Sequence, residues 1–99
     1  MNMQAMMREA QKLQKELLKT QEELEKTEYE ASSSLVKVKI NGNKELVSID
    51  IDKENPLDKE DIEMLEDMIM VAFNEAIKKA DQDKNAKLGK YGSGLSGLM

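Results

Sequence analysis

The chain has 99 residues, which is enough for one small domain. It has no His and no Cys, so disulfides, Cys/His zinc sites, cysteine nucleophiles and histidine bases are excluded. The formal net charge is −5, from 15 basic and 20 acidic side chains. No apolar run approaches the ~18 residues of a membrane-spanning helix, and the first residues lack the apolar stretch of a signal peptide. We therefore expect a cytoplasmic protein that packing alone holds together.

A long helix is predicted over residues 3–26. Its apolar side chains alternate three and four residues apart, as at the a and d positions of a coiled coil, and good helix formers fill the rest. The helix would be about 36 Å long, whereas a compact domain of this size has a radius of gyration of about 13 Å. Because the chain cannot cover so long a seam, we expect a homodimer that buries it. The seam consists of Met3, Met6, Ala10, Leu13, Leu17 and Leu24.

Three segments of alternating apolar and polar residues predict an antiparallel meander. The strands are expected at residues 27–31, 35–40 and 46–52. A serine-rich break at 32–34 separates the first two. Asn41–Gly42 predicts a hairpin turn, because this pair readily supplies left-handed backbone. The residues of the third strand expected to face inward are Val47, Ile49 and Ile51.

A second helix is predicted after Asp58, a favourable N-cap residue. The segment Met68–Phe73 is apolar on all sides, so one face can cover the sheet. The other face needs a further cover, and Met68 and Val71 are expected to join the dimer interface. Residues 89–99 hold four of the five glycines and predict a flexible tail. The fold class is thus α+β, with one domain over residues 1–88.

Two acidic patterns superficially resemble metal sites. The run beginning at Asp50 resembles a calcium loop but has Asn55 where such a loop needs Gly. Glu63, Glu66 and Asp67 share a helix face, but no His completes a di-iron site. No Ser lies in a nucleophile-elbow setting, and no Gly-rich loop leads from a strand into a helix. We therefore expect no enzyme activity and no bound metal, cofactor or small-molecule substrate.

Four cations on the first helix recur at steps of four, three and four, so they form one stripe that faces away from the apolar seam. This basic stripe consists of Arg8, Lys12, Lys15 and Lys19. It can contact the phosphates of a polyanion, because charges within a Debye length of ~8 Å matter more than the net charge. It can equally be the solvated outer face of a coiled coil, where Glu9 and Glu16 also lie. The residues alone favour neither the phosphate-contacting ridge nor the solvated face.

The chain also carries three longer segments in a definite order: Asn2–Gln14, Leu35–Gly42 and Asp58–Ala76. Together they resemble the YbaB/EbfC family of small bacterial nucleoid-associated proteins, over residues 2 to about 88. The resemblance implies a helix, three strands and a helix, paired into an intertwined homodimer whose long helices project like tweezers. This chain has serines at 32–34, where relatives often have glycines.

The resemblance implies binding to double-stranded DNA in the nucleoid, with little sequence preference, through the basic ends of the two helices. The implied DNA-binding residues are Arg8, Lys12, Lys15, Lys19, Lys78, Lys79, Lys84, Lys87 and Lys90. No element carries the base-reading side chains of a helix-turn-helix, so we expect contacts to phosphates. The alternative hypothesis is a non-enzymatic protein-interaction module, in which the helices hold a partner protein and the basic stripe is a solvated face.

Overall fold

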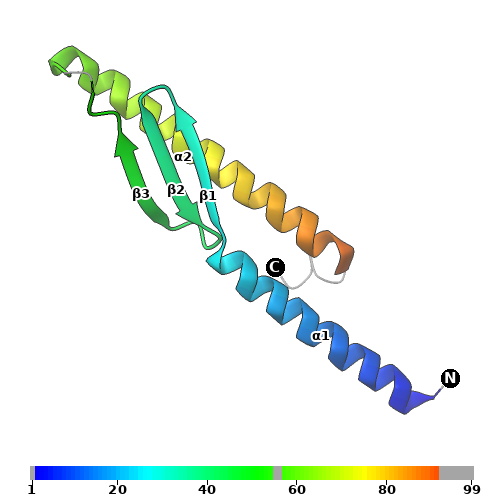
Figure 1. Ribbon diagram of the computed structural model, residues 1–99. Coiled ribbons are helices and arrows are strands. Elements are labelled where there is room, and N and C mark those ends of the chain that lie inside the picture. Colours follow the sequence, from blue (N-terminus) through cyan, green and yellow to red (C-terminus); the bar gives the residue numbers. More distant parts are fainter. Residues whose placement is uncertain (1, 55–56, 92–99) are drawn as a thin grey trace.

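The computed structural model describes residues 2–54 and 57–91. Its elements are α1 (Met3–Lys26), β1 (Glu28–Ser33), β2 (Val36–Asn41), β3 (Leu46–Ile51), α2 (Lys59–Leu88) and the 3-10 helix η1 (Gly89–Tyr91). The strands form one sheet in the order β1-β2-β3, and both pairs are antiparallel. Helix α2 lies along the sheet, and α1 extends beyond the end of it (Figure 1). The α+β fold class and the order of elements are confirmed.

Helix α1 has the predicted boundaries, and side chains at both ends fix them. Asn2 Oδ1 accepts a hydrogen bond from the backbone N–H of Gln4 at 3.0 Å. At the other end, the backbone N–H of Thr27 donates to the carbonyl oxygens of Glu23 and Leu24 at 3.1 and 3.2 Å. Thr27 has extended backbone angles, so the chain passes from α1 into β1 with no intervening loop.

The first hairpin differs from the prediction. Ser32 and Ser33 pair with Lys37 and Val36 in the β1–β2 ladder, so they are strand residues and not a break. The turn consists of Ser34 and Leu35 alone. Ser34 has a positive φ of 51°. Because two-residue hairpin turns need left-handed backbone, Ser34 takes the conformation that Gly usually supplies.

The second hairpin turn forms at the predicted place but with a different left-handed residue. Lys44 has a φ of 64°, whereas Gly42 is not in the left-handed region. The side chain of Asn41 organises the turn: its Oδ1 accepts from the backbone N–H groups of Asn43 and Glu45 at 2.9 and 3.0 Å. Gly42 has another function, since it lies directly against the backbone of α1.

Helix α2 begins at the predicted N-cap. Asp58 Oδ1 accepts from the backbone N–H of Glu60 at 3.2 Å, and Asp61 Oδ2 accepts from the backbone N–H of Asp58 at 3.0 Å. This reciprocal pair is a capping box. The acidic first turn also stabilises the positive end of the helix dipole.

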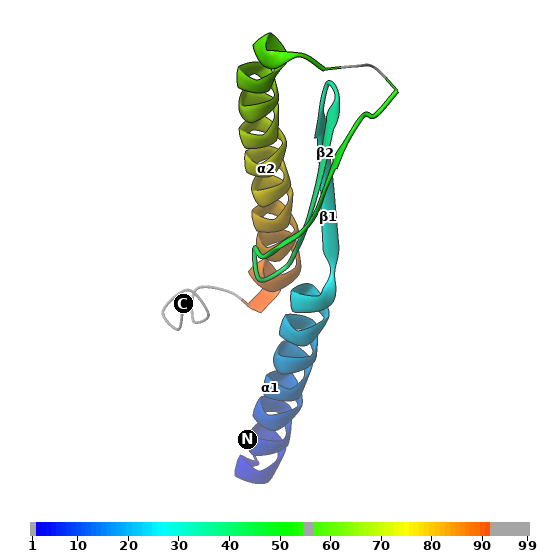
Figure 2. The same ribbon diagram turned by 90° about the vertical axis from the view of Figure 1, so that its left-hand side faces the viewer.

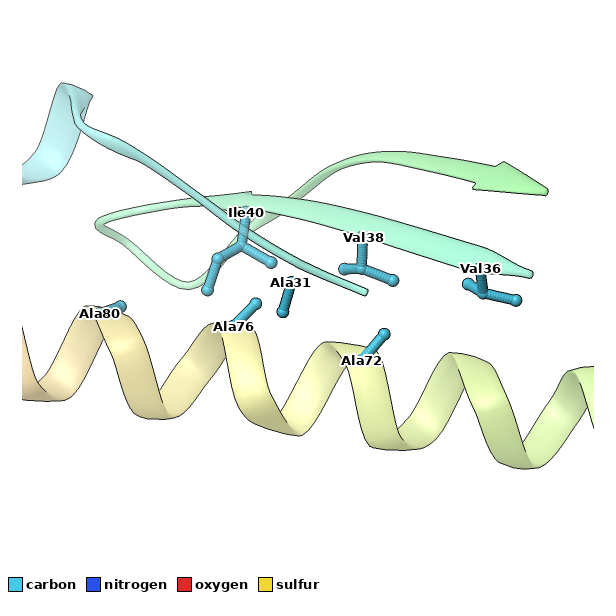
Figure 3. Packing of buried hydrophobic residues seen from close by; sticks show 7 residues of the cluster. All are labelled: Ala31, Val36, Val38, Ile40, Ala72, Ala76 and Ala80. Carbon is cyan, nitrogen blue, oxygen red and sulfur yellow. The ribbon is translucent and has the colours of Figure 1, made fainter. Parts of the chain in front are cut away.

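The main core lies between α2 and the sheet. Three alanines of α2, four residues apart, face alternate apolar residues of β2, and their short side chains let the helix approach the strands closely (Figure 3). All members of this cluster are at most 5% exposed. They are Ala31, Val36, Val38, Ile40, Ala72, Ala76 and Ala80.

Strand β3 departs from the expected burial. Val47 and Ile49, predicted to face inward, are 48% and 41% exposed. Ile49 pairs with Val38 and therefore lies on the core side of the sheet. However, α2 packs on β1 and β2. One helix is about 10 Å across, whereas three strands about 4.8 Å apart need a wider cover. The predicted side is therefore correct for Ile49. A register shift in the β2–β3 ladder places Leu46 opposite Ile40 and no residue of β2 opposite Val47, so the strict alternation predicted for β3 fails there. The predicted burial of Val47 and Ile49 was wrong.

The protein is an elongated rod of 71 × 20 × 15 Å with a radius of gyration of 19.6 Å. A second apolar cluster joins the end of α1 to the end of α2, where Leu24 and Leu88 are buried and Leu17 and Tyr91 pack against them. Beyond this joint, residues 3–16 of α1 are all exposed. We call this segment the arm (Figure 2). The expected tail begins with η1, which continues α2, while residues 92–99 lie outside the described part of the chain.

Candidate nucleic-acid interface

The basic stripe runs along the projecting part of α1. Arg8, Lys12 and Lys15 lie on the arm, Lys19 follows it, and all four are exposed. At a rise of ~1.5 Å per residue, the stripe is about 16 Å long. Its cations therefore form a ridge on the part of the molecule that projects farthest from the sheet (Figure 1).

Within the described residues, the cations of the stripe have no carboxylate partners, unlike the lysines of the sheet. In residues 2–54 and 57–91, the ion pairs are Lys37–Glu30 at 3.7 Å, Lys39–Glu28 at 4.0 Å, Lys44–Asp81 at 2.8 Å and Lys87–Asp83 at 3.1 Å. None of these pairs involves a residue of the stripe. Carboxylates of the same chain thus largely neutralise the lysines of the sheet. The positive charge of the stripe, by contrast, is available to an external anion.

The lysines of α2 do not form a comparable row. Lys78 is exposed. Lys79 Nζ donates to the carbonyl oxygen of Glu30 at 2.7 Å, which ties it to β1. Lys84 lines a hollow of about 240 Å³ between α1, the β2–β3 turn and α2. Lys87 is held by Asp83. Lys90 lies in η1, and its side chain is outside the described part of the structure.

Asp83 links the end of α2 to the sheet. The hydroxyl of Tyr29 in β1 donates to Asp83 Oδ2 at 2.5 Å, and Lys87 approaches the same oxygen. This hydrogen bond is the main cause that lowers the pKa of Asp83 below its usual value. Burial, with the adjacent carboxylate, raises the pKa of Tyr29 to about 12. Tyr29, Asp83 and Lys87 thus form one chain of contacts between β1 and α2. Lys87 therefore stabilises this packing in addition to contributing positive charge to the surface.

The fold brings the basic stripe of α1 and the lysines near the end of α2 to the same end of the rod. Leu24 packs against Leu88, and the hydroxyls of Thr20 and Tyr91 lie 3.5 Å apart. Residues 58–77, by contrast, carry seven carboxylates and one lysine, a net charge of −6. They occupy the opposite end, at the start of α2 (Figure 1). The molecule is therefore electrostatically polar along its length.

The residues expected at the dimer interface fall into two groups. Several are freely exposed: Met3 is 76%, Met6 51%, Leu13 53% and Val71 51% exposed, and Ala10 is also exposed. The others have partners within the chain. Leu24 is buried in the joint, Leu17 packs against it, and Met68 packs against the main core.

A further apolar surface was missed by the sequence reasoning. Leu46 is 50% exposed on β3, beside Val47 and Ile49, and Met70 of α2 is 56% exposed. Met70 precedes Asp81 by three helical turns, so both lie on one flank of α2, and Asp81 pairs with Lys44 of the β2–β3 turn. That flank therefore faces the β3 side of the sheet. We call Leu46, Val47, Ile49 and Met70 the open face. The sequence contained one signal for this surface. A single helix follows three predicted strands, and one helix is too narrow to cover all three.

Within the described ranges, no cluster of three or more His, Cys, Asp or Glu side chains could hold a metal ion. The described helices also include none long and apolar enough to cross a membrane.

Comparison with known proteins points to one family. A family model described as the YbaB/EbfC DNA-binding family matches residues 1–95. A nucleoid-associated protein of Ligilactobacillus salivarius is 41% identical, over 99% of this chain and 95% of its own length. One of Alkaliphilus metalliredigens is 44% identical, over 96% of this chain and 84% of its own length. The crystal structure of an uncharacterised protein, HP0035 of Helicobacter pylori, is similar with a TM-score of 0.68 and 26% identity, covering 93% of this chain and 99% of that one.

Proposed function

The chain belongs to the YbaB/EbfC DNA-binding family, and we propose that it binds double-stranded DNA as a nucleoid-associated protein through the basic stripe of a homodimer. The observation that carries this proposal is the stripe itself. Its four cations are exposed on a projecting helix, and within the described residues no carboxylate pairs with them.

The net charge of −5 does not prevent this contact. The acidic start of α2 lies at the other end of a rod 71 Å long. Exposed charges separated by more than a Debye length of ~8 Å are largely screened at physiological salt. A phosphate beside the arm therefore experiences mainly the stripe. The nearest opposing charges on α1 are Glu9 and Glu16, between its cations, and Glu22 and Glu23, one turn beyond Lys19.

The chemistry of the stripe favours binding with little sequence preference. Arg and Lys side chains on one ridge contact phosphates, which position a protein on DNA without reading its sequence. Affinity of this kind is on the order of micromolar and strongly salt-dependent. Lys78 and Lys84 are proposed as additional contacts, and Lys90 with them. Lys79 and Lys87 contribute less, because each already has a partner in the fold.

The homodimer is proposed from the uncovered apolar surface. The open face exposes Leu46, Val47 and Ile49 on β3 and Met70 on α2. A contiguous apolar patch of this kind is typical of an interaction site. A two-fold contact between copies would cover both open faces at once and place two arms on one particle. The remaining proposed members of this interface are Met3, Met6, Ala10, Leu13, Leu17 and Val71, with Leu24 and Met68 supporting it from within each chain.

The test is fluorescence anisotropy with a labelled ~30-bp duplex in about 50 and then about 200 mM salt. The stripe variant carries Gln in place of Arg8, Lys12, Lys15 and Lys19. If all four cations contact phosphates, wild-type affinity falls about 150-fold per arm between these salt concentrations, and the variant loses that dependence.

A matched control removes the same charge elsewhere, with Gln at Lys37, Lys39, Lys44 and Lys59. Both variants have a net charge four units more negative, so a difference between them reports position and not total charge. Equal loss of binding in both would contradict a specific role for the stripe. No binding by wild type in the lower salt, together with a partner protein captured after nuclease treatment, would instead support the protein-interaction module.

A further inference from the structure

One side of the basic stripe combines its cations with uncharged amides. Residues three or four positions apart are neighbours on the surface of a helix. Arg8 and Lys15 have no carboxylate among such neighbours. Gln4, Arg8, Gln11 and Lys15 follow one another at steps of four, three and four, and all are exposed on the arm. We call these four residues the amide row, which extends about 17 Å along α1.

The other side of the stripe combines its cations with carboxylates. Glu9, Lys12, Glu16 and Lys19 follow one another at steps of three, four and three, and all are exposed. We call these four residues the acidic row. Within the described residues, no ion pair joins them. Their side chains are nevertheless helical neighbours, so each lysine has carboxylates of its own helix within reach.

The two rows therefore differ in what they offer to a phosphate. A carboxylate beside a lysine attracts the lysine and repels an approaching phosphate, and separations shorter than the Debye length of ~8 Å leave both effects largely unscreened. The amide row contains no group that repels a phosphate. Its amide N–H groups can donate hydrogen bonds to phosphate oxygens, as Gln side chains do in protein–DNA complexes.

We propose that α1 contacts the DNA backbone through the amide row. Arg8 and Lys15 provide the main phosphate contacts, and the amides of Gln4 and Gln11 donate hydrogen bonds to the same backbone. The carboxylates of the acidic row repel the backbone and keep the duplex on one side of the arm. This inference rests on the proposed function and narrows the contact to one side of the stripe.

Two double variants of equal charge compare the rows by anisotropy with a labelled ~30-bp duplex. One carries Arg8→Gln and Lys15→Gln, and the other carries Lys12→Gln and Lys19→Gln. With two phosphate contacts per arm, wild-type affinity falls about 12-fold per arm between about 50 and about 200 mM salt. The first variant should lose this dependence, whereas the second should retain most of it. Gln is a good helix former, and circular dichroism checks that both variants keep their helices.

A single substitution tests the physical reason for the difference. Gln11→Glu places a carboxylate three positions after Arg8 and four before Lys15, so it gives the amide row the chemistry of the acidic row. It should reduce the salt dependence by about 3.5-fold per arm, the equivalent of one phosphate contact. Gln14→Glu is the control, because it adds the same charge but is not a helical neighbour of either cation.

The outcomes separate this inference from the proposed function. Equal losses of salt dependence in the two double variants, or a larger loss in the variant of the acidic row, would overturn the assignment to the amide row and leave DNA binding by the stripe intact. Equal effects of Gln11→Glu and Gln14→Glu would also overturn it. Absence of DNA binding by wild type would overturn both proposals.

Discussion

A β-carbon on Gly42 would lie 1.7 Å from the carbonyl oxygen of Leu24. The tip of the β2–β3 hairpin thus rests directly on the last turn of α1, with no side chain between the two backbones. Since Thr27 alone connects α1 to β1, this contact and the Leu24–Leu88 cluster fix the direction of the arm. The direction in which the basic stripe points therefore depends on a glycine in a turn far from the stripe.

Gly42→Ala is expected to destabilise the protein by about 1–3 kcal/mol, because backbone must move to admit the methyl group. Gly89→Ala is the control, since nothing lies within 4 Å of a β-carbon there and the residue has helical backbone angles. It should stabilise the protein by about 0.4–1 kcal/mol. Urea unfolding followed by circular dichroism measures both, and equal stabilities for the two variants would contradict the close contact.

A distance between two spin labels would report the direction of the arm. The chain has no Cys, so introduced cysteines place the labels at chosen positions. Cysteines in place of Gln14 on the arm and Ser48 on β3 carry the labels, and dilution with unlabelled protein isolates the distance within one chain of the proposed homodimer. Gly42→Ala should shift or broaden its distribution, and Gly89→Ala should not. An unchanged distribution in Gly42→Ala would show that the hairpin contact does not set the direction of the arm.

Ala76→Leu tests the close approach of α2 to the sheet. Ala76 is fully buried against β2, so a larger side chain must separate the helix from the strands (Figure 3). We expect a loss of about 1–3 kcal/mol in the free energy of unfolding. Glu75→Leu places the same side chain one residue away on the exposed side of α2 and should change stability by less than about 0.5 kcal/mol.

The Tyr29–Asp83 hydrogen bond predicts an alkaline loss of stability. The pKa of Tyr29 is raised to about 12, so the folded state keeps the phenolic proton to higher pH than the unfolded state. Stability from this group is therefore complete below pH 10 and is lost as the pH rises from 10 to about 12. Urea midpoints of wild type and Tyr29→Phe should converge over this range. Parallel curves would contradict the assignment.

The dimer proposal predicts that charge on the open face dissociates the protein without unfolding it. Val47→Asp with Ile49→Asp adds two carboxylates to side chains that are already 48% and 41% exposed in one chain. Light scattering at micromolar concentration should show a folded monomer. Ser48→Asp, on the opposite face of β3, should remain dimeric. A wild-type protein that is monomeric at the same concentration would contradict the proposal.

The local patterns of the sequence were sufficient for the elements themselves. The heptad spacing and Asn2–Lys26 composition predicted α1 at its observed bounds, and Asp58 was identified as the N-cap of α2. These features depend on residues within a few positions of one another, so periodicity and capping chemistry reveal them. The same reasoning identified the cations of the basic stripe as neighbours on one helix face.

Turn details were less accessible, because several residues can adopt left-handed backbone at some cost. Ser34 and Lys44 take it here, although Gly42 had the stronger local signal. The glycine is instead required by the backbone of Leu24, which lies 18 residues away in the sequence. The contact between the β2–β3 turn and α1 requires glycine at this position. No local sequence pattern reveals such a contact.

Spacing along the chain was enough to tell which segments are helix or strand and which side chains share a face. Which of those faces are covered follows from the packing of the elements in three dimensions. The structure showed that α2 covers β1 and β2 but leaves β3 open, and that sheet lysines are paired while the stripe is not. The physical reason is that secondary structure follows from short-range spacing along the chain. Burial and charge pairing depend instead on which surfaces meet in three dimensions, and one helix is too narrow for three strands.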